Sequence, residues 1–221
     1  MSARVRYLVF YPGDMPLVIS APHGGSLEPK SIPFRITGNP RSDLNTRELA
    51  SEIAGEMGDP FFVAAGIKRS KVDFNRPPEE AFNGSPGRNY YEAFHGKLRE
   101  YIQLCLDRFG SCFLLDVHGF STKNYGNHHV IFGTGCYNSL TGNALGQLSR
   151  VLNNEGWKVL HKHTGYFSGG YIIRQYAGPP VVGVQMEVCK DIRLNSAFRR
   201  KFAGYVAEGL KKIIKDSKSS R

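Results

Sequence analysis

Two histidines and one glutamate occupy equivalent places along this chain. His23 and His118 each follow a short apolar run and precede a glycine, and Glu187 ends a third apolar run. Apolar runs bounded by turn residues are typical of buried strands. Open α/β sheets bind their ligands at the carboxyl ends of the strands. Two imidazoles and a carboxylate at one sheet edge therefore predict a metal site with an attached base, which is the chemistry of a hydrolase.

The metal site needs a third ligand, because zinc in hydrolases usually takes three protein ligands and leaves one position open. We predict His23 and His118 as two of them, since the glycine after each leaves room for a ligand. Two carboxylates are candidates for the third. Glu28 stands five residues after His23, where the alternative is a solvated loop charge. Asp43 precedes a predicted helix, where the alternative is an N-cap.

Two further carboxylates have predicted roles beside the metal. Asp116 lies two residues before His118, so strand alternation turns both side chains the same way, and we expect Asp116 to orient an imidazole. Glu187 ends a buried run, where a carboxylate without a partner is costly. We predict that it acts as the general base, taking a proton from the attacking water and passing it to the leaving amine. A structural ion pair with Arg193 is the alternative.

Residues that could bind a substrate carboxylate follow another apolar segment. Arg76 precedes Pro77, so we expect it to project from the end of a strand. A planar guanidinium can grip a carboxylate with two hydrogen bonds, and Asn75 could add another. The alternative for Arg76 is a surface loop arginine. Gly169 and Gly170 would allow close approach of the backbone to a ligand, although glycines are also common in turns.

The elements that must position these residues alternate between strand and helix. We predict strands over 7–10, 17–21, 61–65, 70–74, 112–117, 128–132, 157–161, 171–174 and 181–187, and helices over 45–57, 90–109, 139–154 and 195–215. This alternation predicts an α/β fold, a three-layer α/β/α sandwich with a mixed, mainly parallel sheet. The long irregular stretches 24–43 and 76–89 follow strand ends that carry candidate residues, and such loops are often functional.

Composition places the chain among globular proteins. It has 221 residues, 41% hydrophobic and 22% charged. We expect a single domain over 1–221, with a basic C-terminal helix at about 195–215 and a flexible tail at 216–221. No apolar stretch approaches the roughly 18 residues of a membrane span, so we expect no membrane partner. No signal peptide is recognisable, so the expected location is cytoplasmic. The four cysteines form no CxxC pair, which argues against a cysteine zinc knuckle.

The net charge of +10 is concentrated near the C-terminus. Residues 190–221 hold ten Lys or Arg against three Asp or Glu, which gives +7 of the total. A basic helix of this kind can attract nucleic acid. A solvated helix face is the simpler interpretation, and a positive field would also draw in a small acidic substrate.

Six motifs connect the candidate residues into one pattern. They are residues 20–25 (SAPHGG), 43–50 (DLNTRELA), 72–78 (VDFNRPP), 115–119 (LDVHG), 167–172 (FSGGYI) and 185–187 (QME). In these motifs and their order the chain resembles the N-formylglutamate amidohydrolase family, within the zinc carboxypeptidase-like superfamily. The resemblance implies a carboxypeptidase-like (phosphorylase/hydrolase-like) α/β/α fold and one zinc ion per chain, held by two histidines and a carboxylate with a glutamate as base. His23, His118 and Glu187 match those positions.

The resemblance also bears on the third ligand and the substrate. The chain is similar to a phage poly-γ-glutamate hydrolase of this superfamily, whose metal carboxylate precedes a T-x-E-L-A-like stretch. Asp43 before 46–50 matches that placement, so the resemblance favours Asp43 over Glu28. Asn75 and Arg76 resemble the superfamily's site for a substrate carboxylate. The run DVHGF at 116–120 departs from the D-C-H-S-like run of enzymes that act on formylglutamate, which leaves the acyl group and the amino acid open.

We therefore expect a zinc-dependent amidohydrolase that cleaves an amide bond of an N-acyl amino acid bearing a carboxylate. Arg174 or Arg193 is expected to assist with the acidic group or the oxyanion. Among enzymes, the alternative is a carboxypeptidase-like or γ-glutamyl peptidase. Outside the enzymes, the alternative is a basic nucleic-acid-binding protein that uses the C-terminal helix. The oligomeric state is left open.

Overall fold

A mixed sheet forms the centre of the structure, which is a computed structural model describing residues 7–121, 125–135 and 139–219. Its seven strands lie in the order β1-β3-β2-β4-β7-β5-β6. The strands are β1 (Leu8–Tyr11), β2 (Leu17–Ala21), β3 (Phe61–Ala65), β4 (Cys112–Phe120), β5 (Val130–Gly133), β6 (Val159–Lys162) and β7 (Val181–Cys189). Neighbouring strands are parallel except for the β1–β3 and β5–β7 pairs. The sheet is therefore mixed and mainly parallel, as the sequence predicts.

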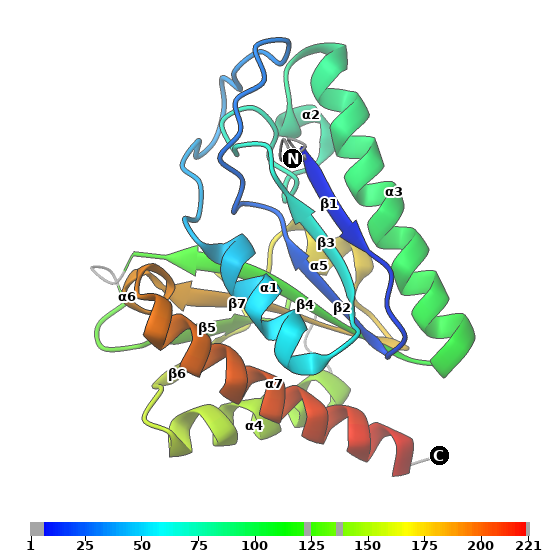
Figure 1. Ribbon diagram of the computed structural model, residues 1–221, viewed down its shortest axis with the longest axis vertical. Helices are drawn as coiled ribbons and strands as arrows, with labels where there is room; N and C mark the ends of the chain where they lie inside the picture. Colours follow the sequence, from blue (N-terminus) through cyan, green and yellow to red (C-terminus); the bar gives the residue numbers. More distant parts are fainter. Residues whose placement is uncertain (1–6, 122–124, 136–138, 220–221) are drawn as a thin grey trace, which may run out of the picture.

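Helices cover both faces of this sheet (Figure 1). One face carries α1 (Thr46–Met57), α4 (Ser139–Asn154) and α7 (Ser196–Ser219), and the other carries α3 (Gly84–Phe109) and α5 (Tyr171–Tyr176). The short helices α2 (Pro78–Ala81) and α6 (Lys190–Leu194) complete the described elements. This arrangement confirms the predicted three-layer α/β/α sandwich.

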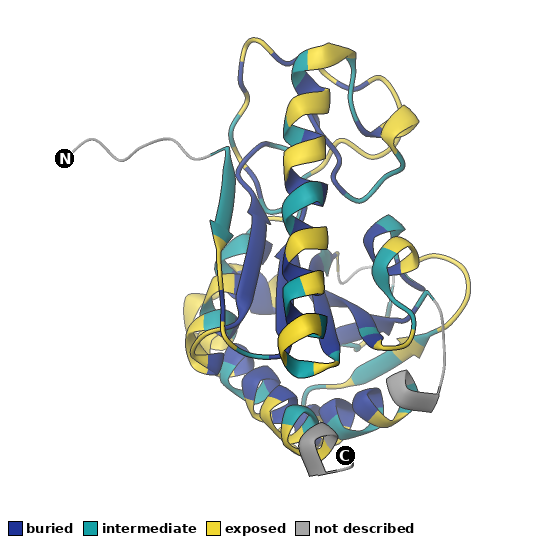
Figure 2. Ribbon diagram, turned by 90° about the vertical axis from the view of Figure 1, so that its right-hand side faces the viewer, coloured by how far each residue is buried: buried dark blue, intermediate teal, exposed yellow. Residues whose placement is uncertain are grey.

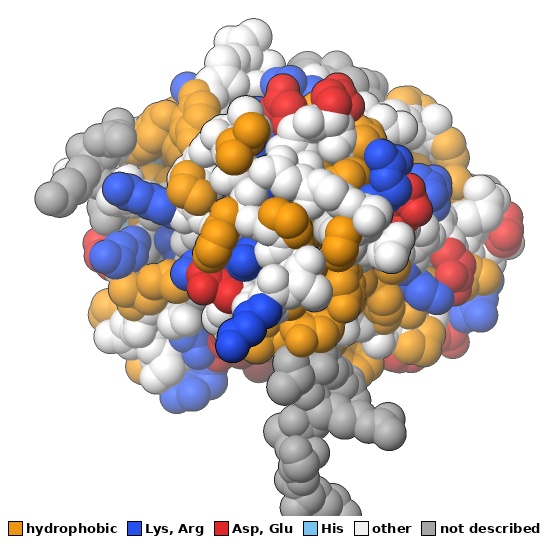
Figure 3. Space-filling model, turned by 90° about the horizontal axis from the view of Figure 1, so that it is seen from above, with side chains coloured by type: hydrophobic (Ala, Val, Ile, Leu, Met, Phe, Trp, Pro, Cys, Tyr) orange, Lys and Arg blue, Asp and Glu red, His pale blue; other side chains and the backbone are white. Residues whose placement is uncertain are grey.

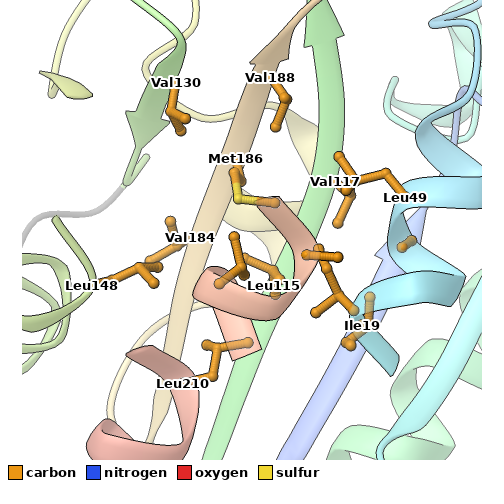
Figure 4. Close-up of a cluster of buried hydrophobic side chains, with 14 of the residues drawn as sticks. Ile19, Leu49, Leu115, Val117, Val130, Leu148, Val184, Met186, Val188 and Leu210 are labelled. Atoms are coloured by element: carbon orange, nitrogen blue, oxygen red, sulfur yellow. The ribbon is translucent and has the colours of Figure 1, made fainter. Parts of the chain in front are cut away.

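Strand alternation divides the buried side chains between two hydrophobic cores. Ile19 and Leu115 face the α1, α4 and α7 side, where they pack in one cluster with Met186 and Leu210 (Figure 4). The intervening residues, such as Leu114, face the other side and pack with α3. Figure 2 shows buried strands behind α3, whose outward face is exposed. Central strands buried on both faces read as continuous apolar runs, which is why they are visible in the sequence.

Two of the predicted strands are wrong. Residues 70–74 form turns and one isolated bridge, and their backbone groups bond locally, as in Asp73 N to Ala81 O at 2.8 Å. Residues 171–174 belong to helix α5, although the pair Ile172-Ile173 favours a strand by propensity. Both isoleucines are buried against the α3 side, and consecutive residues can share a buried side only on a helix.

Element ends also differ from the predicted ones. The stretch 76–89 contains α2 and the start of α3, which begins at Gly84. At the other end of the chain, α7 continues through Ser219 rather than ending at residue 215, and residues 220–221 of the predicted tail lie outside the described residues.

Charged side chains are dispersed over the face that is at the top of the molecule in Figure 1. Figure 3 shows Lys and Arg side chains scattered there among hydrophobic and acidic ones. On α7, Arg199 forms a partly buried ion pair with Glu52 of α1 at 2.9 Å, so this positive charge of α7 helps to join the two helices. In the described part of the chain, no helix is long and apolar enough to cross a membrane.

Candidate active site

The carboxyl ends of three adjacent parallel strands bring the predicted chemistry together. His23 follows the end of β2, His118 lies near the end of β4, and Glu187 lies near the end of β7. In the β4–β7 pairing His118 stands beside Glu187, and their side chains leave the sheet on the side of α3 and α5. All three residues are buried, with exposed fractions of 1%, 2% and 3%.

Asp43 completes a compact group with the two histidines. Its Oδ2 lies 3.4 Å from His23 Nδ1 and 3.3 Å from His118 Nδ1. One potential ligand atom from each of the three residues lies within 4.8 Å of the other two. Two imidazole nitrogens and one carboxylate oxygen are a donor set that suits zinc and leaves a coordination position open.

Both histidines are oriented by a second carboxylate. His23 Nε2 contacts Asp73 Oδ1 at 2.6 Å, and His118 Nε2 contacts Asp116 Oδ2 at 2.9 Å. Ser20 Oγ in turn donates to Asp116 Oδ1 at 2.6 Å. Because a carboxylate only accepts, these shorter contacts place a ring hydrogen on Nε2, and each Nδ1 faces Asp43, where it can coordinate a metal.

An unpartnered nitrogen in the group supports a metal. His23 Nδ1 is buried and has no hydrogen-bond partner. A buried polar atom without a partner is costly, and a bound cation would satisfy it. The residues present therefore fit a zinc ion.

Charge in the group favours a cation as well. Burial alone would raise the pKa of the Asp43 carboxyl, but His118 and His23 hold it well below its usual range. Burial likewise opposes ionisation of Asp73, yet His23 and the guanidiniums of Arg69 and Arg35 keep its pKa far below the usual range. Ionised carboxylates on several sides of the histidines stabilise positive charge between them.

The competing third-ligand candidate lies elsewhere. Glu28 is exposed and pairs with Lys68 at 2.6 Å, and it neither belongs to the His23, Asp43 and His118 group nor lines the cavity beside it. Asp43 is not an N-cap either. The N-cap of α1 is Asn45, and the side chain of Asp43 accepts the amide of Gly119 at 3.2 Å.

Glu187 has the environment of a proton carrier. Gln185 Nε2 donates to Glu187 Oε1 at 2.8 Å, while Oε2 is buried without a partner. Burial raises the pKa of Glu187 to about 7. A carboxyl group with a pKa near neutrality can both accept and return a proton at physiological pH. Within the described residues, no Lys or Arg lies within ion-pair distance of Glu187, so the alternative pairing with Arg193 is not formed.

The guanidinium of Arg193 is engaged in hydrogen bonds to the backbone. Its guanidinium donates to the backbone oxygens of Val188 at 2.9 Å and Phe120 at 3.3 Å, and to that of Leu44. These three carbonyls belong to the ends of β7 and β4 and to the segment before α1. Arg193 therefore joins the strand ends that carry the site, although it also lines the cavity.

The predicted substrate-binding residues lie around the cavity and differ in their hydrogen bonds, packing and exposure. Asn75 Oδ1 accepts the amide of Ile172 at 2.8 Å, and its Nδ2 lies 3.1 Å from His118 Nε2. Gly170 packs so closely on Asn75 that an added Cβ would lie 2.1 Å from Nδ2. Arg76 lines the cavity and pairs with exposed Glu80 at 3.0 Å, and Arg174 is an exposed cation at its edge. Gly169, with φ 118°, adopts a conformation that favours glycine.

Three residues of the candidate site, Arg69, Asp73 and Gln185, are not among the residues predicted from the sequence. Arg69 lies in the KRSK run, which looks like an exposed turn, yet its Nε lies 2.9 Å from Asp73 Oδ2 and its Nη1 lies 3.8 Å from Asp43 Oδ1. Gln185 links Glu187 to the backbone amide of Gly170, which donates to Gln185 Oε1 at 2.5 Å. Asp73 and Gln185 stand inside the quoted motifs, so the motifs were the available signal. No local pattern marks Arg69.

These residues surround a cavity of about 880 Å³. His23, Asp43, His118 and Glu187 lie in its wall, with Arg69, Arg76 and Arg174 on the same surface. Cavities of roughly 300–1,000 Å³ are typical of small-molecule sites. The arrangement can bind a cation, hold an anionic ligand beside it and move a proton at Glu187.

Comparison with known proteins finds similarity in both sequence and fold. The family model described as N-formylglutamate amidohydrolase matches residues 86–193. The N-formylglutamate deformylase of Pseudomonas putida is 25% identical over 84% of this chain and 84% of its own length. The crystal structure of N-formylglutamate amidohydrolase from Ralstonia eutropha JMP134 superposes with a TM-score of 0.77 at 16% identity, over 95% of this chain and 98% of that one.

More distant structures share the fold. A metallo-carboxypeptidase from Burkholderia cenocepacia gives a TM-score of 0.53 at 11% identity, over 95% of this chain and 61% of its own. A bacteriophage poly-gamma-glutamate hydrolase gives 0.50 at 14% identity, over 96% and 91%. Sequence and fold together confirm that this chain resembles the N-formylglutamate amidohydrolase family, as its six motifs predict.

Proposed function

We propose that this protein is a zinc-dependent amidohydrolase that cleaves the amide bond of an N-acyl amino acid bearing a carboxylate, in the manner of an N-formylglutamate amidohydrolase. The observation that carries the proposal is the grouping of His23, Asp43 and His118 beside the buried carboxyl of Glu187. The similarity to N-formylglutamate deformylase supports the substrate class.

The zinc ion would be held by Nδ1 of each histidine and by the carboxylate of Asp43. When bound, it supplies Lewis acidity, which makes water a better nucleophile and a carbonyl carbon a better electrophile. Asp73 and Asp116 hold the imidazoles in the orientation that this binding requires.

Glu187 moves the proton of the reaction. Its unpartnered Oε2 accepts a proton from the attacking water and returns it to the nitrogen of the leaving amine. Gln185 holds the other carboxylate oxygen, so Oε2 keeps one direction during both transfers. A pKa of about 7 matches both the acceptance and the return of the proton near neutral pH.

Basic side chains on the cavity wall would bind the substrate carboxylate. Arg76 presents a half-exposed guanidinium, and its partner Glu80 is exposed, so a substrate carboxylate can replace that pairing at little cost. Asn75 and the backbone at Gly169 and Gly170 lie beside it and complete a polar surface.

Metal content and turnover test the proposal together. Elemental analysis of the purified protein should find about one zinc per chain, and His23→Ala and His118→Ala should lose it. His161→Ala is the matched control, because His161 contacts Ser149 on α4 and should keep its zinc. Glu187→Gln should retain zinc and lower kcat toward N-formyl-L-glutamate or another N-acyl glutamate by about 10²–10⁴-fold. A protein that takes up no zinc when zinc is supplied would contradict the proposal.

A further inference from the structure

An aromatic wall lines one side of the cavity, and the metal centre and the proton carrier do not use it. Phe120, Tyr125, Tyr166 and Phe167 all line the cavity. Their ring centroids are separated by 5.7 Å (Phe120–Tyr125), 6.0 Å (Phe120–Phe167), 5.1 Å (Tyr125–Phe167) and 4.3 Å (Tyr166–Phe167). These four side chains, called the aromatic wall below, form one continuous cluster within ordinary aromatic pairing distance.

Strand order places this wall on the opposite side of the metal-binding group from Arg69 and Arg76. The metal-binding group lies at the ends of β2 and β4, and Glu187 lies on the next strand, β7. Arg69 and Arg76 follow β3, which lies beyond β2. Phe120 ends β4. Phe167 lies against β5, the strand beyond β7, because an added Cβ on Gly133 of β5 would lie 2.3 Å from the carbonyl oxygen of Phe167. An amide at the centre therefore has Arg69 and Arg76 on one side and the rings on the other, where Arg174 also lines the cavity beside Gly135.

The segment that carries half of this wall has an unusual backbone. Phe167 has φ 67°, in the left-handed region that bulky residues rarely adopt. The hydroxyl of Ser168 donates to Gly165 O at 2.7 Å, and its carbonyl accepts the amide of Gly135 at 2.5 Å, so the segment is held in this shape. Such conformations are energetically costly and are concentrated at ligand sites, where they hold a side chain in place.

Tyr166 at the outer end of the wall is largely exposed. Its exposed fraction is 67%, although its ring has apolar faces that would be better buried. A formyl group brings a single carbon and has no surface to cover these rings. An acyl group of ring size could pack between Tyr166 and the rest of the wall, within a cavity of about 880 Å³.

We propose that the acyl group of the substrate is apolar and of about the size of an aromatic ring, as in an N-aroyl or N-arylacetyl amino acid, and that it packs against the aromatic wall. This inference rests on the proposed function. In the reaction the amide C–N bond breaks, the oxygen of water bonds to the acyl carbon, and the amine nitrogen receives the proton that Glu187 carries. The products are an aromatic carboxylic acid and an amino acid.

Hydrolysis of three substrates that differ only in the acyl group tests the inference. We would measure kcat/KM of the zinc-loaded protein for N-formyl-, N-acetyl- and N-benzoyl-L-glutamate. The expected order is benzoyl above acetyl above formyl, with benzoyl about tenfold or more above formyl, because burial of a ring against aromatic partners contributes at least this factor.

A variant of the wall separates specificity from general damage. Tyr166→Ala should lower kcat/KM for the benzoyl substrate about tenfold and change that for the formyl substrate by less than about twofold. Phe198→Ala is the matched control, because Phe198 is also exposed but lies on α7 and does not line the cavity. It should leave both values unchanged.

The outcomes distinguish the two proposals. Turnover of N-formyl-L-glutamate at least as fast as the benzoyl compound would overturn the acyl-group inference and leave the amidohydrolase in place. A benzoyl preference that Tyr166→Ala does not reduce would reject the aromatic wall as its cause. A zinc-loaded protein that hydrolyses none of the three substrates would contradict the proposed function itself.

Discussion

The two histidines of the candidate centre are oriented by different parts of the molecule. His118 is held by Asp116, which lies two residues earlier on the same strand, at 2.9 Å. His23 is held by Asp73, which lies 50 residues later in the chain, at 2.6 Å. We call the first pair the local half of the centre and the second pair the long-range half. The local half is complete once β4 forms, whereas the long-range half exists only when the segment after β3 has packed against the end of β2.

The long-range half also carries more buried charge. Asp73 accepts from Arg69 Nε at 2.9 Å and lies 3.4 Å from Arg35 Nη1, in addition to its contact with His23. Asp116 has the neutral hydroxyl of Ser20 as its other partner. Two equivalent histidines in one site can therefore depend on long-range packing to different degrees. Substitutions in the two halves can measure this difference.

The largest difference is expected in stability. Asp73→Ala leaves the guanidiniums of Arg69 and Arg35 without their buried partner and should lower the free energy of unfolding by about 3–5 kcal/mol. Asp116→Ala leaves only the hydroxyl of Ser20 and one imidazole nitrogen unpaired and should cost about 1–3 kcal/mol. Urea unfolding of both variants in excess chelator measures this without a contribution from zinc. Equal losses would remove the distinction between the two halves.

Zinc affinity should respond more evenly. Asp73→Asn and Asp116→Asn keep the size of each side chain but weaken its hold on the imidazole, and each should reduce zinc affinity by about 10–100-fold. Competition with a chromogenic chelator gives the two affinities. If one substitution leaves the affinity at the wild-type value, the corresponding carboxylate does not orient its histidine.

A pH effect on stability is expected at His95, which lies next to the long-range half. His95 of α3 donates from Nε2 to Phe74 O at 2.9 Å, next to Asp73, and its Nδ1 lies 2.8 Å from the hydroxyl of Tyr176. Burial lowers the pKa of His95 from 6.5 to about 4. The unfolded state therefore binds the proton first as the pH falls, so stability is full above pH 6.5 and declines toward pH 4.

The size of this effect can be isolated with one substitution. Between pH 7 and pH 5 the decline caused by His95 should be about 2 kcal/mol. Urea unfolding of the wild type and of His95→Gln at both pH values gives the contribution of His95 as the difference between the two declines. Identical declines in the two proteins would show that His95 does not titrate in this range.

The smallest effect is expected at the rejected ligand. Glu28→Gln removes a carboxylate that pairs only with exposed Lys68, so zinc affinity should change by less than about twofold. Asp43→Asn is the matched substitution inside the group and should weaken zinc binding far more. A strong loss of zinc in Glu28→Gln would reverse the assignment of the third ligand.

The division into a local and a long-range half also explains which parts of the site could be predicted from the sequence. Strand alternation was enough to place Asp116 on the side of His118, and the apolar run before it predicted the strand. Asp73 stands in a segment that alternates like a strand but folds as turns, because its backbone bonds are closed locally and it has no neighbouring strand. Arg69 lies in a run of charged and small residues, and only tertiary packing shows that its guanidinium faces the site.

Helix α5 shows the same limit in another form. Its residues Ile172 and Ile173 favour a strand by local preference, but the turn at Gly170 and the bond from the amide of Ile172 to Asn75 begin a helix there. The residue that decides this structure is 97 positions away in the chain. The fold class and the ends of the strands were therefore predictable, while the contacts between the loops that connect strands and helices were not.

The packing of Arg193 on Gly119 couples two positions of the chain. An added Cβ on Gly119 would lie 2.2 Å from Arg193 Nε, so the guanidinium fills the place of the missing side chain. Arg193 cannot move aside without giving up its bonds to three backbone carbonyls. A homologue with a serine or a larger residue at position 119 must place the arginine of position 193 differently or replace it with a shorter residue. Positions 119 and 193 should therefore covary, and an engineer who changes one should change the other in the same step.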